Sequence, residues 1–127
     1  MSILQIRDAQ MRAMREVTTL HALEGGLQKL FSEQCEALGP RVLQEIAEDS
    51  IVKACAFGFE PAHYLGFAAL QMVFGQSFWE QEEHAWAKSI LEDPFLWTSA
   101  HRMQELRQAS VKYLASLAEQ EEQQAEV

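Results

Sequence analysis

The sequence predicts an all-α protein, a compact single-domain bundle of about five or six helices around a buried central helix near residues 61–74. Apolar residues recur every three or four positions in each segment between the Gly and Pro residues. No stretch alternates with the two-residue period of a half-buried strand, and no Asn-Gly or Asp-Gly hairpin turn is present. Segment 61–74 has apolar side chains in every direction, which is typical of a helix covered on all sides.

The first half of the chain is divided by glycine and proline. Apolar side chains keep helical spacing as far as Phe31, and the pair Gly25-Gly26 predicts a break, so this region is one broken helix or two. Gly39 suits the left-handed position just past a helix end, and Pro40 suits the first turn of the next helix. We therefore expect a second, amphipathic helix over about 40–57.

Three further helices follow from the same reasoning. Gly58 and Pro61 repeat the glycine and proline punctuation and introduce the central helix over 61–74. Helical spacing then predicts a short helix over about 82–91 and a longer one over about 99–117. The acidic end of the chain, 119–127, is expected to be a disordered tail, so the predicted domain covers residues 1–118.

Composition limits the classes of partner. The chain has 127 residues, a formal net charge of −9 and only 10 Lys and Arg residues, which disfavours nucleic acid and anionic membrane surfaces. No apolar run is long enough to cross a bilayer. Because no signal peptide pattern is present, we expect a cytoplasmic protein. The expected partner is another protein.

Few residues suggest chemistry. Glu60 and His63 have the spacing that di-iron helical bundles use twice, but the pair occurs once, and Glu60 beside Pro61 also suits a helix start. Cys35 and Cys55 would each need a nearby base to act as nucleophiles, and two inert buried thiols are the alternative. We expect no catalytic residue, no metal and no cofactor.

One region of the sequence suggests a contact surface for another protein. Aromatic residues gather between Phe74 and Trp97, and carboxylates follow Trp79 directly. Tryptophan is enriched in interface hot spots, and acidic side chains complement a basic partner. The alternatives are that the aromatic residues complete the core and that the carboxylates are a solvated face. The candidate contact residues are Trp79, Glu80, Glu82, Glu83, His84 and Trp97.

Several motifs extend over most of the chain, from about residue 6 to 117. They are IRDAQM (6–11), F-x-x-Q-C-x-x-L-G (31–39), IVKACAFGF (51–59), LQMVFGQSF (70–78) and WAKSIL (86–91) before Asp93-Pro94. This succession resembles small bacterial proteins encoded in type VI secretion islands, beside spike-tip PAAR proteins, VgrG proteins and toxic effectors. His84-Ala85 stands where a proline often precedes the tryptophan in that family.

The resemblance implies a scaffold and a genomic setting but no catalytic residues. In that setting we expect a non-catalytic accessory factor, a chaperone or adaptor that binds an effector or spike protein. The alternative is an immunity protein that neutralises a toxin acting in the cytoplasm, and an enzyme using a metal or a cysteine is the third. A homodimer formed through an apolar strip on the first helix is also an open possibility.

Overall fold

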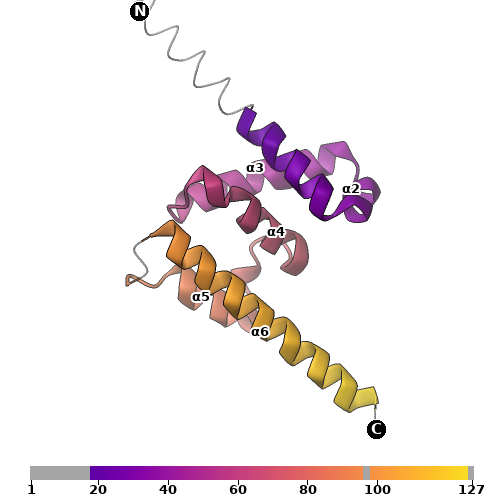
Figure 1. The fold of residues 1–127 in the computed structure, drawn as a ribbon, viewed down its shortest axis with the longest axis vertical. Coiled ribbons are helices and arrows are strands. Elements are labelled where there is room, and N and C mark those ends of the chain that lie inside the picture. Colours follow the sequence, from indigo (N-terminus) through magenta and orange to yellow (C-terminus); the bar gives the residue numbers. More distant parts are fainter. Residues whose placement is uncertain (1–17, 96–97, 126–127) are drawn as a thin grey trace, which may run out of the picture. The chain divides into compact units, whose positions relative to one another are not determined.

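The computed structural model describes residues 18–95 and 98–125, and within these ranges the chain is helical, with turns and no strand (Figure 1). The all-α prediction is confirmed. The structure divides into two compact units, Met1–Val73 and Phe74–Val127, and each is described by itself. That the two units form one domain over residues 1–118 stays a prediction.

The first helix of the first unit covers residues 18–30 and passes through Gly25 and Gly26 without a break. The predicted break at this pair is therefore wrong. The helix stops at Phe31, and α2 (Ser32–Leu38) follows. A Cβ atom on Gly26 would lie 2.8 Å from Cδ1 of Leu65, so this glycine lets the first helix approach α4 closely.

The link between α2 and α3 (Pro40–Ala56) has the predicted form. Gly39 has a φ of 85°, and its N–H donates to the carbonyl of Cys35 at 3.0 Å. Pro40 occupies the first turn of α3, where no backbone donor is needed. The local signal is strong here because both residues meet a backbone requirement that few others satisfy.

A second left-handed glycine ends α3. Gly58 has a φ of 82°, and the N–H of Phe59 reaches back to the carbonyl of Ala54 at 2.9 Å, as in a Schellman cap. A single 3-10 turn, η1 (Pro61–His63), then leads into α4 (Tyr64–Phe74), which matches the predicted central helix. Five of the eleven residues of α4 are buried, and Leu65 and Val73 are 36% and 50% exposed.

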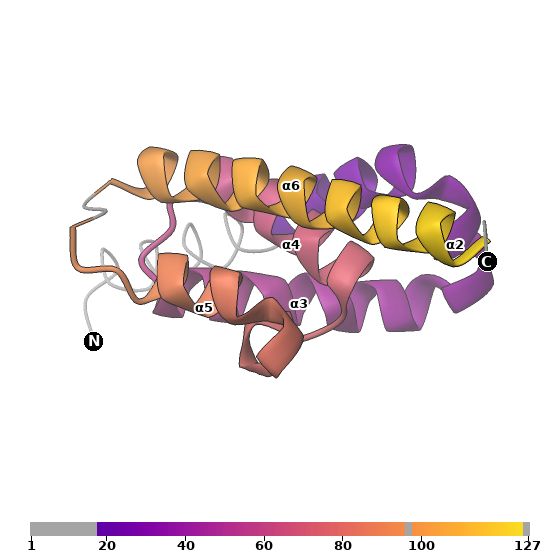
Figure 2. The same cartoon turned by 90° about the horizontal axis from the view of Figure 1, so that it is seen from below.

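The second unit contains two short 3-10 turns and two helices. They are η2 (Phe78–Glu80), η3 (Glu82–His84), α5 (Ala85–Leu91) and α6 (Ser99–Ala125). α5 packs against α6 and against both turns, and Figure 2 shows α5 lying alongside the first half of α6. Both predicted helices of this region are present, and Thr98 Oγ1 accepts the N–H of His101 at the start of α6, at 3.1 Å.

α6 is longer than predicted. It continues as helix through residues 119–125, where the sequence suggested a disordered tail. The segment consists of Glu, Gln and Ala, which have favourable helix propensities, and it contains neither Gly nor Pro. Residues 119–122 are exposed, so the acidic end is solvated as expected although it is helical.

Candidate functional site

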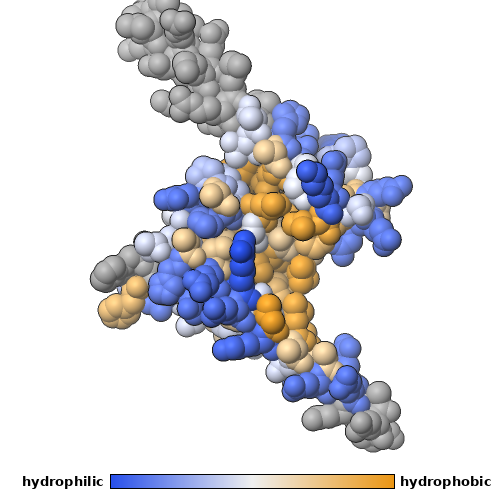
Figure 3. All heavy atoms as spheres, in the orientation of Figure 1, coloured by the Kyte–Doolittle hydropathy of each residue, from blue (hydrophilic) through white to orange (hydrophobic). Residues whose placement is uncertain are grey.

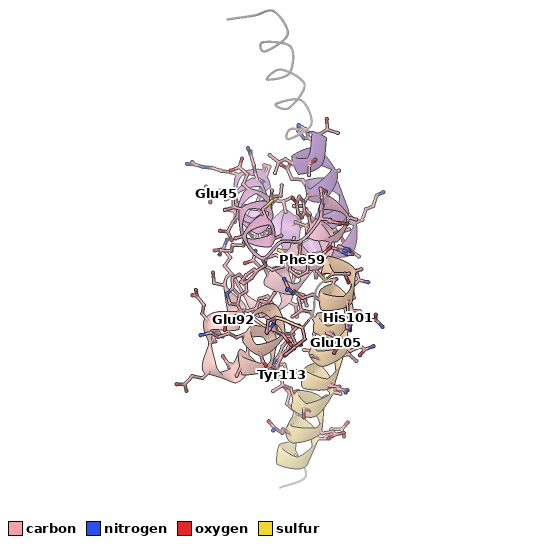
Figure 4. All side chains as sticks on the ribbon, turned by 90° about the vertical axis from the view of Figure 1, so that its left-hand side faces the viewer. Glu45, Phe59, Glu92, His101, Glu105 and Tyr113 are labelled. Atoms are coloured by element: carbon pink, nitrogen blue, oxygen red, sulfur yellow. The ribbon has the colours of Figure 1, made fainter. Side chains whose placement is uncertain are left out.

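Five of the six predicted contact residues lie on the two 3-10 turns of the second unit, around a cluster of aromatic rings. We call Phe74, Phe78, Trp86 and Tyr113 with the imidazole of His84 the aromatic cluster. Ring centroids in it lie 5.2–6.3 Å apart, mostly edge to face or tilted, which is the favoured geometry for aromatic pairs. Tyr113 reaches this cluster from α6 (Figure 4).

His84 lies inside the aromatic cluster. Its ring is 5.2 Å from Phe74 and 5.3 Å from Tyr113, centroid to centroid, and the residue is only 5% exposed. Nδ1 lies 2.9 Å from the carbonyl oxygen of Phe78. Because a carbonyl can only accept, Nδ1 carries the proton of this hydrogen bond. The bond ties the end of η3 to the start of η2 and makes His84 part of the core.

Trp79 is also a core residue. It is 8% exposed, and its ring stands edge-on to Phe78 at a centroid distance of 5.3 Å. The sequence offered Trp79 and His84 as residues that contact a partner, and their burial contradicts that role. Two successive 3-10 turns direct both side chains inward although Glu80 follows Trp79 and Glu83 precedes His84. The other tryptophan of the prediction, Trp97, lies outside the described residues.

The three predicted carboxylates behave differently. Glu80, Glu82 and Glu83 are all exposed, between the buried side chains of Trp79 and His84. We call these three glutamates the acidic segment. Because both ends of the segment are fixed in the core, the carboxylates project from two short turns whose backbone is set by packing. Among the predicted contact residues that the structure describes, the exposed part is therefore a charged surface, and the aromatic side chains are buried.

The proposed metal ligands are not brought together with further donors. Glu60 is exposed, and His63 packs its ring against Phe59 at a centroid distance of 6.4 Å. Among the described residues, no three His, Cys, Asp or Glu side chains gather as a group that could hold a metal ion. The geometry of η1 thus gives the Glu60 and His63 pair no support as a metal site.

Both cysteines are free thiols in different surroundings. Cys35 is buried, its Sγ lies 3.6 Å from the carbonyl of Leu27, and burial raises the pKa of its thiol. Cys55 Sγ lies 2.8 Å from the Tyr64 hydroxyl. The hydrogen bond with Cys55, followed by burial, raises the pKa of Tyr64 to about 12. The raised pKa makes the Tyr64 phenolate, the form that would act as a base for the Cys55 thiol, harder to reach.

A hollow of about 370 Å³ lies beside Cys35 in the first unit. Its walls come from the end of the first helix, α2 and the start of α3, and it is lined by Gln28, Ser32, Cys35, Glu36, Gly39, Pro40 and Leu43. It is partly open to solvent, and burial raises the pKa of the one thiol in its wall. This arrangement lacks the convergent polar groups that fix a ligand in most small-molecule sites.

The sequence did not reveal a buried polar link between α3 and α4. Gln71 is 3% exposed, and its Nε2 donates to Ser50 Oγ at 2.7 Å, with Asp49 Oδ2 further away at 3.5 Å. Ser50 in turn donates to the carbonyl of Ile46 at 2.8 Å, and Lys53 pairs with Asp49 at 2.8 Å. In the sequence, Gln71 is visible only as a polar residue within an apolar helix. The link satisfies polar groups in the core and so has a structural role.

No protein-family model, curated protein or solved structure matches this chain. In the part of the chain that the structure describes, no helix combines the length and the apolar character that a membrane crossing needs.

Proposed function

We propose that this chain is a non-catalytic accessory factor of a type VI secretion island, a cytoplasmic chaperone or adaptor that binds an effector or spike protein. The setting comes from the resemblance described above. The contact is assigned to the acidic segment, because Glu80, Glu82 and Glu83 are exposed while the residues on either side of them are buried. That single observation carries the proposal.

Fixed carboxylates are suited to binding a basic protein surface. Side chains on a mobile loop would lose conformational freedom when a partner binds, at roughly 0.5–1.5 kcal/mol for each immobilised side chain. Here the backbone of the acidic segment is already held by Trp79 and His84, so only the glutamate side chains have to be ordered. The chain's net charge of −9 would also accelerate encounter with a basic partner at low ionic strength.

The test is a binding measurement with the proteins encoded beside this chain. The variant replaces all three glutamates of the acidic segment by glutamine, which keeps size and hydrogen-bonding capacity but removes three charges. We expect the affinity for the effector or spike partner to fall by about tenfold or more. If no neighbouring protein binds the unmodified chain in gentle salt, the proposal fails.

A matched control separates local from overall charge. Glu92, Glu119 and Glu122 are exposed glutamates of the same unit outside the acidic segment, and their replacement by glutamine removes the same total charge. We expect this triple variant to bind with less than about a threefold loss, since distant exposed charges are screened. Equal losses in the two triple variants would contradict a localised contact.

An immunity protein is the second candidate, favoured by the same acidic charge. A basic nuclease would be the natural complement of this surface. The two roles differ in a cellular assay. Expression of an immunity protein rescues cells that produce the neighbouring toxin and blocks the toxin's active site, whereas an adaptor binds without protecting.

An enzyme is the third candidate and has the least support. Its metal variant would use Glu60 and His63, and its thiol variant would use Cys35 or Cys55. Metal analysis of the purified, metal-loaded protein tests the first variant, because substoichiometric metal would remove it. The second variant predicts that alanine at the cysteine abolishes a measurable turnover.

A further inference from the structure

The second half of α6 carries apolar side chains that its own unit does not cover. Near its start the helix buries Met103, Leu106 and Ser110, all on the face that packs against α5. Figures 1 and 2 show α6 continuing beyond the end of α5. There Val111 and Leu114 are 66% and 45% exposed, and Leu117 is 38% exposed.

Val111 and Leu114 belong to a line of exposed residues along α6 that has the spacing found in helix pairs. Arg107, Val111, Leu114, Ala118 and Glu121 follow each other at intervals of four, three, four and three residues, and all five are exposed. This alternation is the heptad spacing that keeps a seam of side chains facing a partner helix. We call these five residues the α6 stripe. Figure 3 shows apolar side chains over the middle of α6 and hydrophilic ones towards its C-terminal end.

The charges of the α6 stripe are arranged symmetrically about its centre. Leu114 stands seven residues after Arg107 and seven before Glu121, with opposite charges at the two ends. A two-fold axis at Leu114 would therefore bring each arginine beside the glutamate of a second copy. It would also place Val111 against Leu117, each three residues from the axis. Two-fold pairing of identical surfaces is the commonest form of homodimer.

A parallel arrangement is disfavoured by the same residues. It would set Glu121 against Glu121, and the neighbouring Glu119 and Glu122 would add like charges at the same end. Like charges opposite each other destabilise helix pairs. We therefore propose that α6 binds α6 of a second copy of this chain in antiparallel orientation, centred on Leu114.

The size of the α6 stripe sets the strength of this contact. The stripe has two exposed aliphatic side chains and one alanine over about two heptads, with Leu117 beside it, and this is less area than the roughly 800 Å² per partner of a standard interface. The dimer should accordingly be weak, and it should dissociate on dilution. Because its end contacts are exposed ion pairs, it should also weaken as salt is raised.

Sedimentation velocity over a range of protein concentrations measures this association. We expect Leu114→Glu to abolish it, because two carboxylates would meet at the two-fold axis. Arg107→Glu and Glu121→Arg should each raise the dissociation constant by about tenfold, since each change makes two attractive pairs repulsive. The double variant with both changes restores opposite charges and should recover the original dissociation constant.

Lys112→Glu is the matched control, because it makes the same charge change as Arg107→Glu on the opposite side of α6. It should leave the association unchanged, and circular dichroism should show equal helix content in all variants. A chain that stays monomeric at every concentration would overturn the proposal. A dimer that still forms in Leu114→Glu would exclude this surface. A double variant whose dissociation constant does not return to the original value would exclude the antiparallel orientation. Either result would also overturn the proposal.

Discussion

The Trp79→Ala variant distinguishes two roles for Trp79, as a residue of the core and as a residue that binds a partner. The sequence offered Trp79 as a candidate contact residue and left its exposure open, and the structure leaves it only 8% exposed, with its ring edge-on to Phe78 at 5.3 Å. Phe78 is itself fully buried in the aromatic cluster. Truncation of Trp79 should therefore open a cavity beside the cluster and lower the free energy of unfolding.

The expected loss is large relative to the stability of a small domain. A buried tryptophan removes about 150–250 Å² from water, which at about 25 cal/mol/Å² is an upper bound of roughly 4–6 kcal/mol. Measured Trp→Ala losses in cores are about 3–5 kcal/mol, and we expect Trp79→Ala to lie in that range. Total stabilities of about 5–15 kcal/mol mean that the variant would be close to unfolding.

Urea unfolding followed by circular dichroism at the helix band measures this change without depending on tryptophan fluorescence. Trp79→Phe is the second variant, because it retains a ring and should lose only about 1–2 kcal/mol if the alanine variant does not fold. Phe95→Ala is the control: Phe95 is 78% exposed, so its loss should stay within about 0.5 kcal/mol. A loss below about 1 kcal/mol for Trp79→Ala would refute the burial of this side chain.

Two further predictions concern the first unit. Gly25→Ala should raise the free energy of unfolding by about 0.5–1 kcal/mol, because Gly25 lies in a helix and an added Cβ would meet nothing within 4 Å. Gly39→Ala should lower the free energy of unfolding, because the φ of Gly39 is +85°. Thermal unfolding of both variants measures the two changes, and changes of the same sign would contradict the backbone conformations of these two glycines. Tyr64 keeps its proton to a pKa of about 12 against an ordinary value of 10, so its stabilising contribution is complete below pH 10 and is lost as the pH rises through 12. Cys55→Ala should lower the pKa of Tyr64, measured by ultraviolet titration of the phenol, whereas Cys35→Ala should leave this pKa unchanged. An unchanged Tyr64 pKa in Cys55→Ala would exclude the hydrogen bond with Cys55 as the main cause of the raised pKa.

Local backbone requirements made much of the fold predictable. Gly39 with Pro40, and Gly58 before Pro61, mark real helix boundaries because left-handed caps and first-turn prolines are encoded by single residues. The break predicted at Gly25 and Gly26 was wrong because a helix tolerates glycine, and Gly26 has a packing role inside the helix. The Cβ that Gly26 lacks would lie 2.8 Å from Leu65, a residue 39 positions further along the chain.

The contact surface was harder to predict because burial there depends on residues distant in sequence. Trp79 and His84 flank a run of Glu and Gln residues and occupy 3-10 turns, so no helical period signals which way they point. Their burial depends on Phe78 and on rings such as Tyr113 on α6. The exposure of the acidic segment was predictable, since isolated carboxylates are almost never fully buried.

Whether the acidic segment binds the effector or spike protein encoded beside this chain is measured by the affinity of the two purified proteins at low and high salt. The acidic segment should account for the salt dependence. We expect tight binding at low salt that weakens as salt is raised, and a Glu80, Glu82 and Glu83 to glutamine variant that binds weakly with little further response to salt. Equal affinity and equal salt dependence for the unmodified chain and this variant would contradict the account.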